Sequence, residues 1–464
     1  MTRRSLLAGL AAASHSKAAG TLRAGAATAN ISPAIGTSLA VGMTDRKTVD
    51  VHDELLVRCA AIESGSTRML FCTIDSCMVP RSILDRARAR IARENAVDPA
   101  CILISSTHTH SAPPAMHLFQ SLPDAHYVAL LEHRIGDAAR MAFLRLRPAR
   151  IGAASGIEPT LVFNRRYYMK EGAIPADPFG GKTDKVLMNP PFGGDTIIKP
   201  AGPVDTEHPV IAALGDDGRM IWVYGSYALH YAGFNPGDHA SADYFGAWAR
   251  RVERALDGDC VALLANGCAA NINGLNPARP YAATRDYTVI ERTASVLAFE
   301  TMRVLKTLGY VSDIKIGGAM EDIELGVRRP SAQETAEAIQ LVGENPGNTY
   351  KERPLIYARE TVFLSKFPAT VKVPVQGLRI GDTGIGAFPG ETFVELGQHI
   401  KKLGLFKTTA TISIANDSCG YIPTVEAFDL GGYETWRAKS SYVERDAATK
   451  LASGVERTLR KVAL

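Results

Sequence analysis

The pattern of apolar residues predicts an α/β fold: one large layered domain with a mixed β-sheet core flanked by helices. Three observations favour this fold class. Short apolar runs typical of buried strands alternate with longer stretches of helical periodicity. The chain has 464 residues, 46% of them hydrophobic, which is enough for a sizeable core. Because no internal repeat and no clean interdomain linker are visible, we expect residues 21–464 to form a single domain.

The first half of the chain is expected to begin with strands and continue with helices. In chain order we expect an entering strand within 21–42, hairpin strands over 55–64 and 68–75, a helix over 82–95, a buried strand over 101–105 and a helix over 124–144. Ser64-Gly65-Ser66 supplies the hairpin turn, and Asp124 is placed to cap the last helix. Residues 167–203 are rich in Gly, Pro, Asp and Lys, which predicts a long loop that is either disordered or functional.

The second half continues the alternation of strands and helices. We expect strands over 220–227, 261–265, 369–380, 383–388 and 408–415, and helices over 243–256, 288–305, 330–343 and 440–459. Ser331 and Glu334 form a capping-box pattern at the start of the third of these helices.

The N-terminus has the pattern of an export signal. Arg3 and Arg4 precede a short apolar run and then small residues, so residues 1–20 are expected to be a twin-arginine-like signal peptide. The alternative is an ordinary frayed terminus. With a signal peptide, the mature protein would be periplasmic or secreted.

Composition argues against several other classes of protein. No later segment reaches the 18 or so consecutive apolar residues of an integral membrane span. The formal net charge is +4 and no basic stripe is interleaved with aromatic residues, which argues against nucleic acid as a partner. The seven cysteines are odd in number and widely spread, so a disulfide framework is not expected.

The strongest local signal for chemistry is His108-Thr109-His110 at the end of the apolar strand 101–105. Alternate residues of a strand share a face, so both imidazoles are expected to point the same way. At the carboxyl end of a strand they would project into the crevice where α/β folds bind ligands. Imidazole is a donor suited to Zn²⁺. The alternative is two ordinary polar residues at a strand exit.

The residues around this motif resemble a known family. Ser106 to Pro113 is similar to the Thr-His-Thr-His-Ser-Gly-Pro motif of the neutral/alkaline ceramidases. Four further matches follow in the family's order: Phe163-Asn164-Arg165, Leu229-His230 with Ser241 to Tyr244, Phe388-Pro389-Gly390-Glu391, and Asn416 to Tyr421 with Thr424 and Tyr433. The resemblance implies the catalytic domain of that family without its C-terminal β-sandwich.

The resemblance also implies roles for individual residues. His108, His230 and Glu391 would bind Zn²⁺, and Tyr421 is a candidate fourth ligand. His110 would transfer protons, since imidazole titrates near neutral pH. Arg165 and Tyr433 would stabilise an oxyanion or bind a substrate hydroxyl.

One departure from the family concerns the nucleophile. Asn271 stands where the family has a serine, and an amide cannot attack a carbonyl. Cys268 is nearby but offset by three residues, with no partner that would activate it. We therefore expect water activated by the metal to attack the substrate, with Asn271 in an oxyanion or positioning role or in a purely structural one.

The function expected from sequence is zinc-dependent hydrolysis of a linear amide bond in an N-acyl compound. The substrate would be a small molecule or a lipid, with ceramide, another amide and an ester left open. The alternative is a non-catalytic protein of the same fold that binds zinc, a lipid or a sugar. Oligomeric state is left open.

Overall fold

The largest element of the computed structural model is an eight-stranded mixed sheet. The structure describes residues 22–40, 42–282, 284–347 and 349–464, so the expected signal peptide lies outside the described residues. In spatial order the strands are β16 (Val261–Asn266), β14 (Met220–Tyr227), β13 (Glu207–Gly215), β8 (Arg147–Ile157), β1 (Arg23–Asn30), β5 (Leu56–Ser64), β6 (Thr67–Ile74) and β7 (Ile102–Ser106). The outer pairs β14–β16 and β6–β7 are parallel and the other pairs are antiparallel, which confirms a mixed sheet.

The sheet bends where β1 meets β8, so its two halves face each other. These two strands share only two register pairs, Arg23 with Pro148 and Ala24 with Arg147. Phe71 of β6 packs against Trp222 and Tyr224 of β14, with ring centroids 6.4 and 4.9 Å apart. The buried aromatic cluster between the halves is therefore the centre of the core.

A second sheet forms a third wall around this core. Its strands are β18 (Ile316–Gly326), β19 (Thr370–Ile380), β20 (Thr383–Ala387) and β22 (Thr408–Ile412), with β20 and β22 parallel. Leu378 and Ile385 from this sheet join the same cluster as Phe71 and Trp222. Val373 and Val375 of β19 point to the opposite face of this sheet and belong to another hydrophobic cluster.

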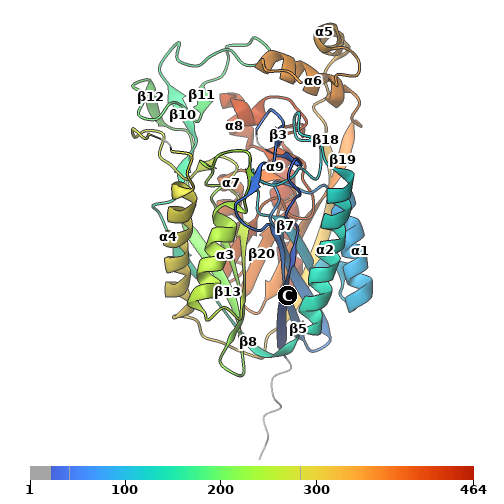
Figure 1. Ribbon diagram of the computed structural model, residues 1–464, viewed down its shortest axis with the longest axis vertical. Coiled ribbons are helices and arrows are strands. Elements are labelled where there is room, and N and C mark those ends of the chain that lie inside the picture. The colour runs from blue at the N-terminus through green and yellow to red at the C-terminus, as the bar shows by residue number, and fades with distance from the viewer. Residues whose placement is uncertain (1–21, 41, 283, 348) are drawn as a thin grey trace, which may run out of the picture.

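Helices cover the outer faces of the three walls. The helices are α1 (Arg81–Asn95), α2 (Ala125–Leu144), α3 (Asp243–Ala255), α4 (Thr288–Leu305), α5 (Ala332–Val342), α6 (Arg353–Ser365), α7 (Val394–Lys402), α8 (Val425–Leu430) and α9 (Ala447–Ala463), with 3₁₀ turns at Pro99–Cys101 and Tyr433–Thr435. Figure 1 shows α1 with α2 on one side of the molecule and α3 with α4 on the other. Helix α9 packs on β18 and β19. The predicted α/β class with flanking helices is confirmed.

Short strands lie mainly in the loops between these layers. They are β2 (Ser38–Leu39), β3 (Arg46–Lys47), β4 (Asp50–Val51), β9 (Phe163–Asn164), β10 (Arg166–Met169), β11 (Val186–Met188), β12 (Ile197–Pro200), β15 (His239–Ala240), β17 (Ile272–Asn273), β21 (Glu391–Thr392) and β23 (Tyr421–Ile422). Strands β10 to β12 form a small sheet at the same end of the molecule as α5 and α6 (Figure 1). None of the helices in the described residues is both long and apolar enough to cross a membrane.

Several local predictions are confirmed. Asp124 caps α2 by accepting a hydrogen bond from the Tyr127 amide at 2.8 Å, and Ser331 with Glu334 forms the capping box of α5. All seven cysteines are buried and free of disulfides.

Two predictions of local structure are wrong. Residues 167–203 are not an unstructured loop, because they contain most of the three-stranded sheet β10–β12, whose strands of three or four residues are too short to show periodicity. The closing helix begins at Ala447 rather than residue 440, since Ser441 and Val443 form β-bridges to Gly420 and Val327.

The contact between α2 and β1 gives a test of the packing. A Cβ added to Gly25 of β1 would clash with the carbonyl oxygen of Ala142 and lie 2.9 Å from the Arg145 carbonyl carbon. Overpacking against backbone atoms costs about 1–3 kcal/mol, so Gly25→Ala should lower the midpoint of urea unfolding. Gly317→Ala in β18 is the matched control, because nothing lies within 4 Å of the added atom there. Equal midpoints for the two variants would contradict the close α2–β1 contact.

Candidate metal centre

Loops that follow separate strands bring the predicted site residues together. His108 follows β7, His230 follows β14, and Glu391 begins β21 between β20 and α7. The side-chain amide of Asn266, at the end of β16, joins the two histidine loops. Its nitrogen donates hydrogen bonds to the carbonyl oxygens of Thr107 at 3.1 Å and of His230 at 2.8 Å. Because Asn266 is buried, these two bonds hold the loops in a fixed relation.

The histidine pair adopts a different local geometry from the one expected. Strand β7 ends at Ser106, and His108 has a φ of 71°, in the left-handed region. The expectation that alternate strand positions align the two rings is therefore wrong. The turn at His108 aligns them instead, since the Nε2 atoms of His108 and His110 lie 3.1 Å apart.

His108, His230 and Glu391 form what we call the three-donor cluster. The Nε2 atoms of the two histidines are 3.0 Å apart, and Glu391 Oε2 lies 3.3 Å from the first and 3.5 Å from the second. All three side chains are buried, and Glu391 Oε2 has no hydrogen-bond partner. Three ligand atoms thus converge on one point inside the protein.

Backbone carbonyls fix which nitrogen of each ring is free. His108 Nδ1 lies 2.8 Å from the Cys77 carbonyl oxygen, and His230 Nδ1 lies 3.3 Å from that of Ala269. A carbonyl oxygen only accepts hydrogen bonds, so in each neutral ring Nδ1 carries the proton and Nε2 keeps a lone pair. Metal-binding histidines are oriented in this way by the bond that their other nitrogen makes.

The distances within the three-donor cluster suit a zinc ion. Tetrahedral Zn²⁺ has bonds of 2.0–2.1 Å to nitrogen and oxygen, which places neighbouring donors about 3.3 Å apart. The observed separations of 3.0, 3.3 and 3.5 Å bracket that value. Two histidines with one carboxylate and a free position are also a common donor set of catalytic zinc. The residues present therefore fit the metal that the sequence resemblance implies.

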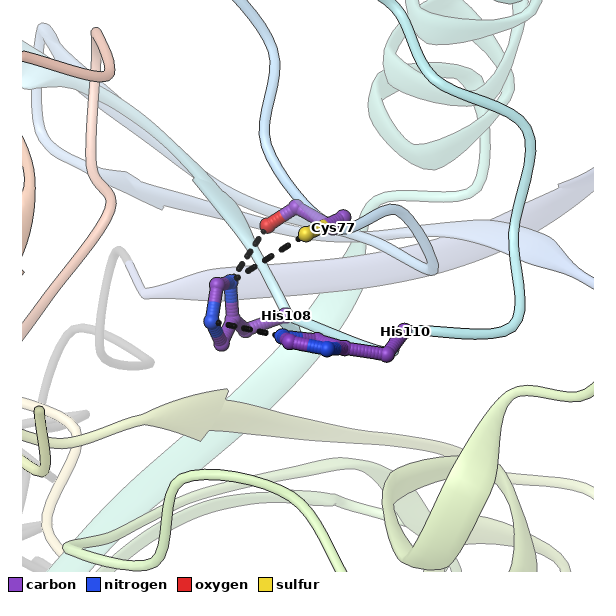
Figure 2. A group of neighbouring side chains, drawn as sticks. All are labelled: Cys77, His108 and His110. Carbon is purple, nitrogen blue, oxygen red and sulfur yellow. Dashed lines mark hydrogen bonds between the residues drawn. The ribbon is translucent and has the colours of Figure 1, made fainter. Parts of the chain in front are cut away.

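A second group of possible ligands consists of Cys77, His108 and His110. Figure 2 shows that Cys77 and His110 approach opposite nitrogens of the His108 ring. The Cys77 thiol lies 3.7 Å from Nδ1, the nitrogen that donates to the backbone. A single ion cannot bind at both nitrogens of one ring, so this group is less suited to a metal than the three-donor cluster.

The three histidines of the site differ in the direction in which their pKa values are shifted. Burial disfavours a charge on His108, but the facing Cys77 and Glu391 raise its pKa well above the ordinary value. Burial, followed by the charges of His108 and Arg165, lowers the pKa of His110 well below that value, and burial with Arg165 does the same to His230. In the metal-free site a stably added proton is therefore held by His108, whereas His110 stays neutral and readily gives up a proton that it accepts.

Arg165, Tyr421 and Tyr433 lie beside the three-donor cluster, and the roles that the resemblance implies for them stay predictions. Tyr421 is the cross-strand partner of Glu391, and its hydroxyl accepts a hydrogen bond from Arg165 Nη2 at 3.2 Å. Burial raises the pKa of Tyr421 well above the ordinary value and raises that of Tyr433 too. The phenols therefore stay protonated, which suits hydrogen-bond donation, and ligation by Tyr421 remains a prediction.

Asn271 does not reach the reaction centre. Its Nδ2 donates to Glu395 Oε2 at 3.0 Å, and its Oδ1 accepts from the Val394 amide at 2.9 Å, at the start of α7. The side chain is buried and borders neither cavity that the described residues form at the site. Of the roles left open from sequence, the structural one fits this position. Cys268 is also buried, and burial raises the pKa of its thiol to about 12.

Three residues at the site were not found from sequence. Glu434 accepts a hydrogen bond from Arg165 Nε at 2.9 Å, and Tyr231 stacks on His110 with ring centroids 3.9 Å apart. Both directly follow a predicted residue, but sequence does not show where they point. Cys77 could have been found from sequence. It follows β6 and His108 follows the neighbouring parallel strand β7, so both residues lie at the same edge of the sheet.

Two cavities border the centre. The wide cavity has a volume of ≈ 590 Å³, and His110, His230 and Arg165 are among its lining residues. The narrow cavity has a volume of ≈ 70 Å³ and is bordered by His108, Glu391 and several apolar side chains. His110, Tyr421 and Tyr433 line both cavities. The two cavities therefore adjoin at these three side chains, beside the three-donor cluster.

Comparisons with solved structures identify the fold. The neutral ceramidase of Pseudomonas aeruginosa matches with a TM-score of 0.70 and 16% identity, over 96% of this chain and 75% of the ceramidase chain. The chain has a ceramidase-like fold. A structure described as ceramidase complexed with C2 matches over the same shares, with a TM-score of 0.69 and 14% identity. No family model matches the sequence, and no curated protein matches it.

Metal content tests the three-donor cluster. His230→Ala removes one of three donors, and the affinity for the metal depends strongly on each ligand. We therefore expect bound zinc to fall from about one ion per chain to a small fraction. His110→Ala should keep the ion, since the remaining donors are intact. The measurement is elemental analysis of protein dialysed against Zn²⁺. Full zinc content in His230→Ala would contradict the assignment.

Asn271→Ala separates a structural role from a catalytic one. Loss of the amide leaves Glu395 and the Val394 N–H without a partner, which should cost about 1–3 kcal/mol of stability. Bound metal and most of the turnover should remain at low temperature. The checks are urea unfolding and turnover per bound ion. Normal stability combined with lost turnover would contradict the structural role.

Proposed function

We propose that this protein is a zinc-dependent hydrolase of a linear amide bond in N-acyl compounds. The observation that carries the proposal is the three-donor cluster, in which two imidazole lone pairs and a carboxylate oxygen converge beside a cavity large enough for a substrate. The ceramidase-like fold supports the same reaction class by analogy.

His108, His230 and Glu391 would hold the metal. When bound, Zn²⁺ polarises a carbonyl group and lowers the pKa of water to about 7. The surrounding protein holds the two histidine rings in position. Its backbone carbonyls at Cys77 and Ala269 fix the ring orientations before substrate arrives.

Arg165 and Tyr433 are placed to stabilise negative charge on the carbonyl oxygen. The hydrogen bond to Glu434 fixes the guanidinium group of Arg165, so that the position of this group does not depend on substrate. Tyr433 lies on the wall shared by both cavities, and its raised pKa keeps the hydroxyl proton available for donation. Such preorganised donors are a large part of catalysis in acyl transfer.

His110 is placed to move the proton. Stacking on Tyr231 holds its ring in the wall that the two cavities share. In the proposed reaction a water oxygen adds to the carbonyl carbon and its proton passes to His110. The amine nitrogen then takes this proton as the C–N bond breaks, which yields a free amine and a carboxylic acid that loses its proton to solvent.

Turnover with and without metal tests the proposal. A set of N-acyl arylamides should be hydrolysed by the zinc-loaded protein, with loss of turnover after dialysis against 1,10-phenanthroline and recovery when Zn²⁺ is restored. Tyr433→Phe should lower kcat by about 10²–10³-fold through loss of one oxyanion donor, with bound zinc unchanged.

The matched control is Tyr168→Phe, because Tyr168 lies on β10 and packs near Lys199 rather than at the cavity. A zinc-loaded protein that hydrolyses none of these amides would instead support a non-catalytic binding protein of this fold.

A further inference from the structure

The wide and narrow cavities differ in charge, and this difference bears on the substrate. Arg46, Arg285 and Arg353 line the wide cavity and are exposed to solvent. Within the described part of the chain, no carboxylate lies within ion-pairing distance of these three guanidinium groups. The arginines thus bring positive charge to the cavity that is not neutralised by a paired acid.

The acidic residues of the same cavity are already engaged. Asp243 accepts hydrogen bonds from the amides of Ala232, Gly233 and Tyr244. Asp184 accepts a hydrogen bond from the Trp436 indole at 2.9 Å. Deeper in the cavity, Arg165 is paired with Glu434. The positive charge free to act on a ligand therefore belongs to the outer arginines.

Two of these arginines flank a space that a glycine keeps open. A Cβ on Gly237 would overlap Arg46 Nη1 and lie 3.7 Å from Arg285 Nη1, so both guanidinium groups border the same point. The φ of 89° at Gly237 also disfavours any other residue. Two like charges that border the same point repel each other, and an anion placed between them offsets that repulsion.

The narrow cavity has the opposite character. Met78, Met116, Leu118 and Phe119 line it. The ammonium group of Lys439 also borders it, but Lys439 is paired with the buried carboxylate of Glu360, with 3.6 Å between Nζ and Oε1. An apolar group is therefore suited to the narrow cavity, and its volume of ≈ 70 Å³ suits a short one.

We propose that the substrate is an N-acyl compound whose amine half carries an oxyanion, such as a carboxylate or sulfonate, bound between Arg46 and Arg285. The apolar acyl half occupies the narrow cavity, which places the amide carbonyl beside the three-donor cluster. This inference rests on the proposed amide hydrolysis, and it names the substrate class that the charges of the site select.

A matched set of probes tests the charge preference. N-hexanoyl derivatives of 4-aminobenzoate, 4-aminobenzenesulfonate and 4-aminobenzamide share the acyl group and release anilines of similar size whose para substituents differ in charge. The anionic probes should show kcat/KM about tenfold or more above the neutral amide, as expected for charge-assisted hydrogen bonds. In the double variant Arg46→Gln with Arg285→Gln, this ratio should fall to near one. Arg292→Gln, an exposed arginine of α4 away from the cavity, should keep the ratio.

Binding by calorimetry gives an independent readout on the zinc-loaded protein. The 4-aminobenzoate probe should bind about tenfold tighter than the 4-aminobenzamide probe, and the double variant should lose this difference. Equal values for charged and neutral probes, with amides still hydrolysed, would overturn the inference and leave the proposed function intact. Tighter anion binding without any hydrolysis would support the anion site and count against the proposed function.

Discussion

Two imidazole nitrogens that carry lone pairs face each other 3.0 Å apart in the interior, with a carboxylate oxygen beside them. Acceptors brought together without a donor repel, and each buried one left unsatisfied costs about 1–3 kcal/mol. A shared proton can relieve one such contact, whereas a divalent cation relieves all three. The backbone bonds at Nδ1 of His108 and His230 enforce this arrangement, since they remove the ring rotation that would otherwise relax it.

The fold supplies the rigidity that keeps these three acceptors close together despite their repulsion. The three walls enclose one continuous core, and the site loops leave it at the ends of β7, β14 and β20. Asn266 links two of these loops through its side-chain amide, and Asn271 anchors the third by capping the start of α7 next to Glu391. The two asparagines therefore hold the loops that carry all three donors. They act as structural supports of the centre.

Sequence patterns predicted much of the fold because strands and helices with clear periodicity dominate it. The hairpin β5–β6 and helices α2 and α4 match closely, whereas strands β8 and β13 were not predicted. Small and polar residues interrupt β8, and the apolar run of β13 is only five residues long, Val210 to Leu214. The site residues came from motif resemblance. Sequence could not give the partner of Arg165 or the stacking of Tyr231, because each contact joins two distant loops. The loops of Arg165 and Glu434 are about 270 residues apart in the chain, and those of His110 and Tyr231 about 120. It also placed the histidines on a strand, where a left-handed turn in fact aligns them.

In the proposed mode of binding, the distribution of charge along the wide cavity would orient a substrate before the reaction. At depth, Glu434 offsets part of the charge of Arg165 and leaves its guanidinium group placed for the oxyanion of the proposed reaction. Toward Gly237, Arg46 and Arg285 lack such partners and their field extends into the cavity, where low-dielectric walls concentrate it. In this proposal an anionic group would be drawn to the outer part of the cavity, and the apolar narrow cavity would accept the opposite end of the molecule. The bond between the two ends would then lie near His110, Tyr421 and Tyr433, which border both cavities beside the three-donor cluster.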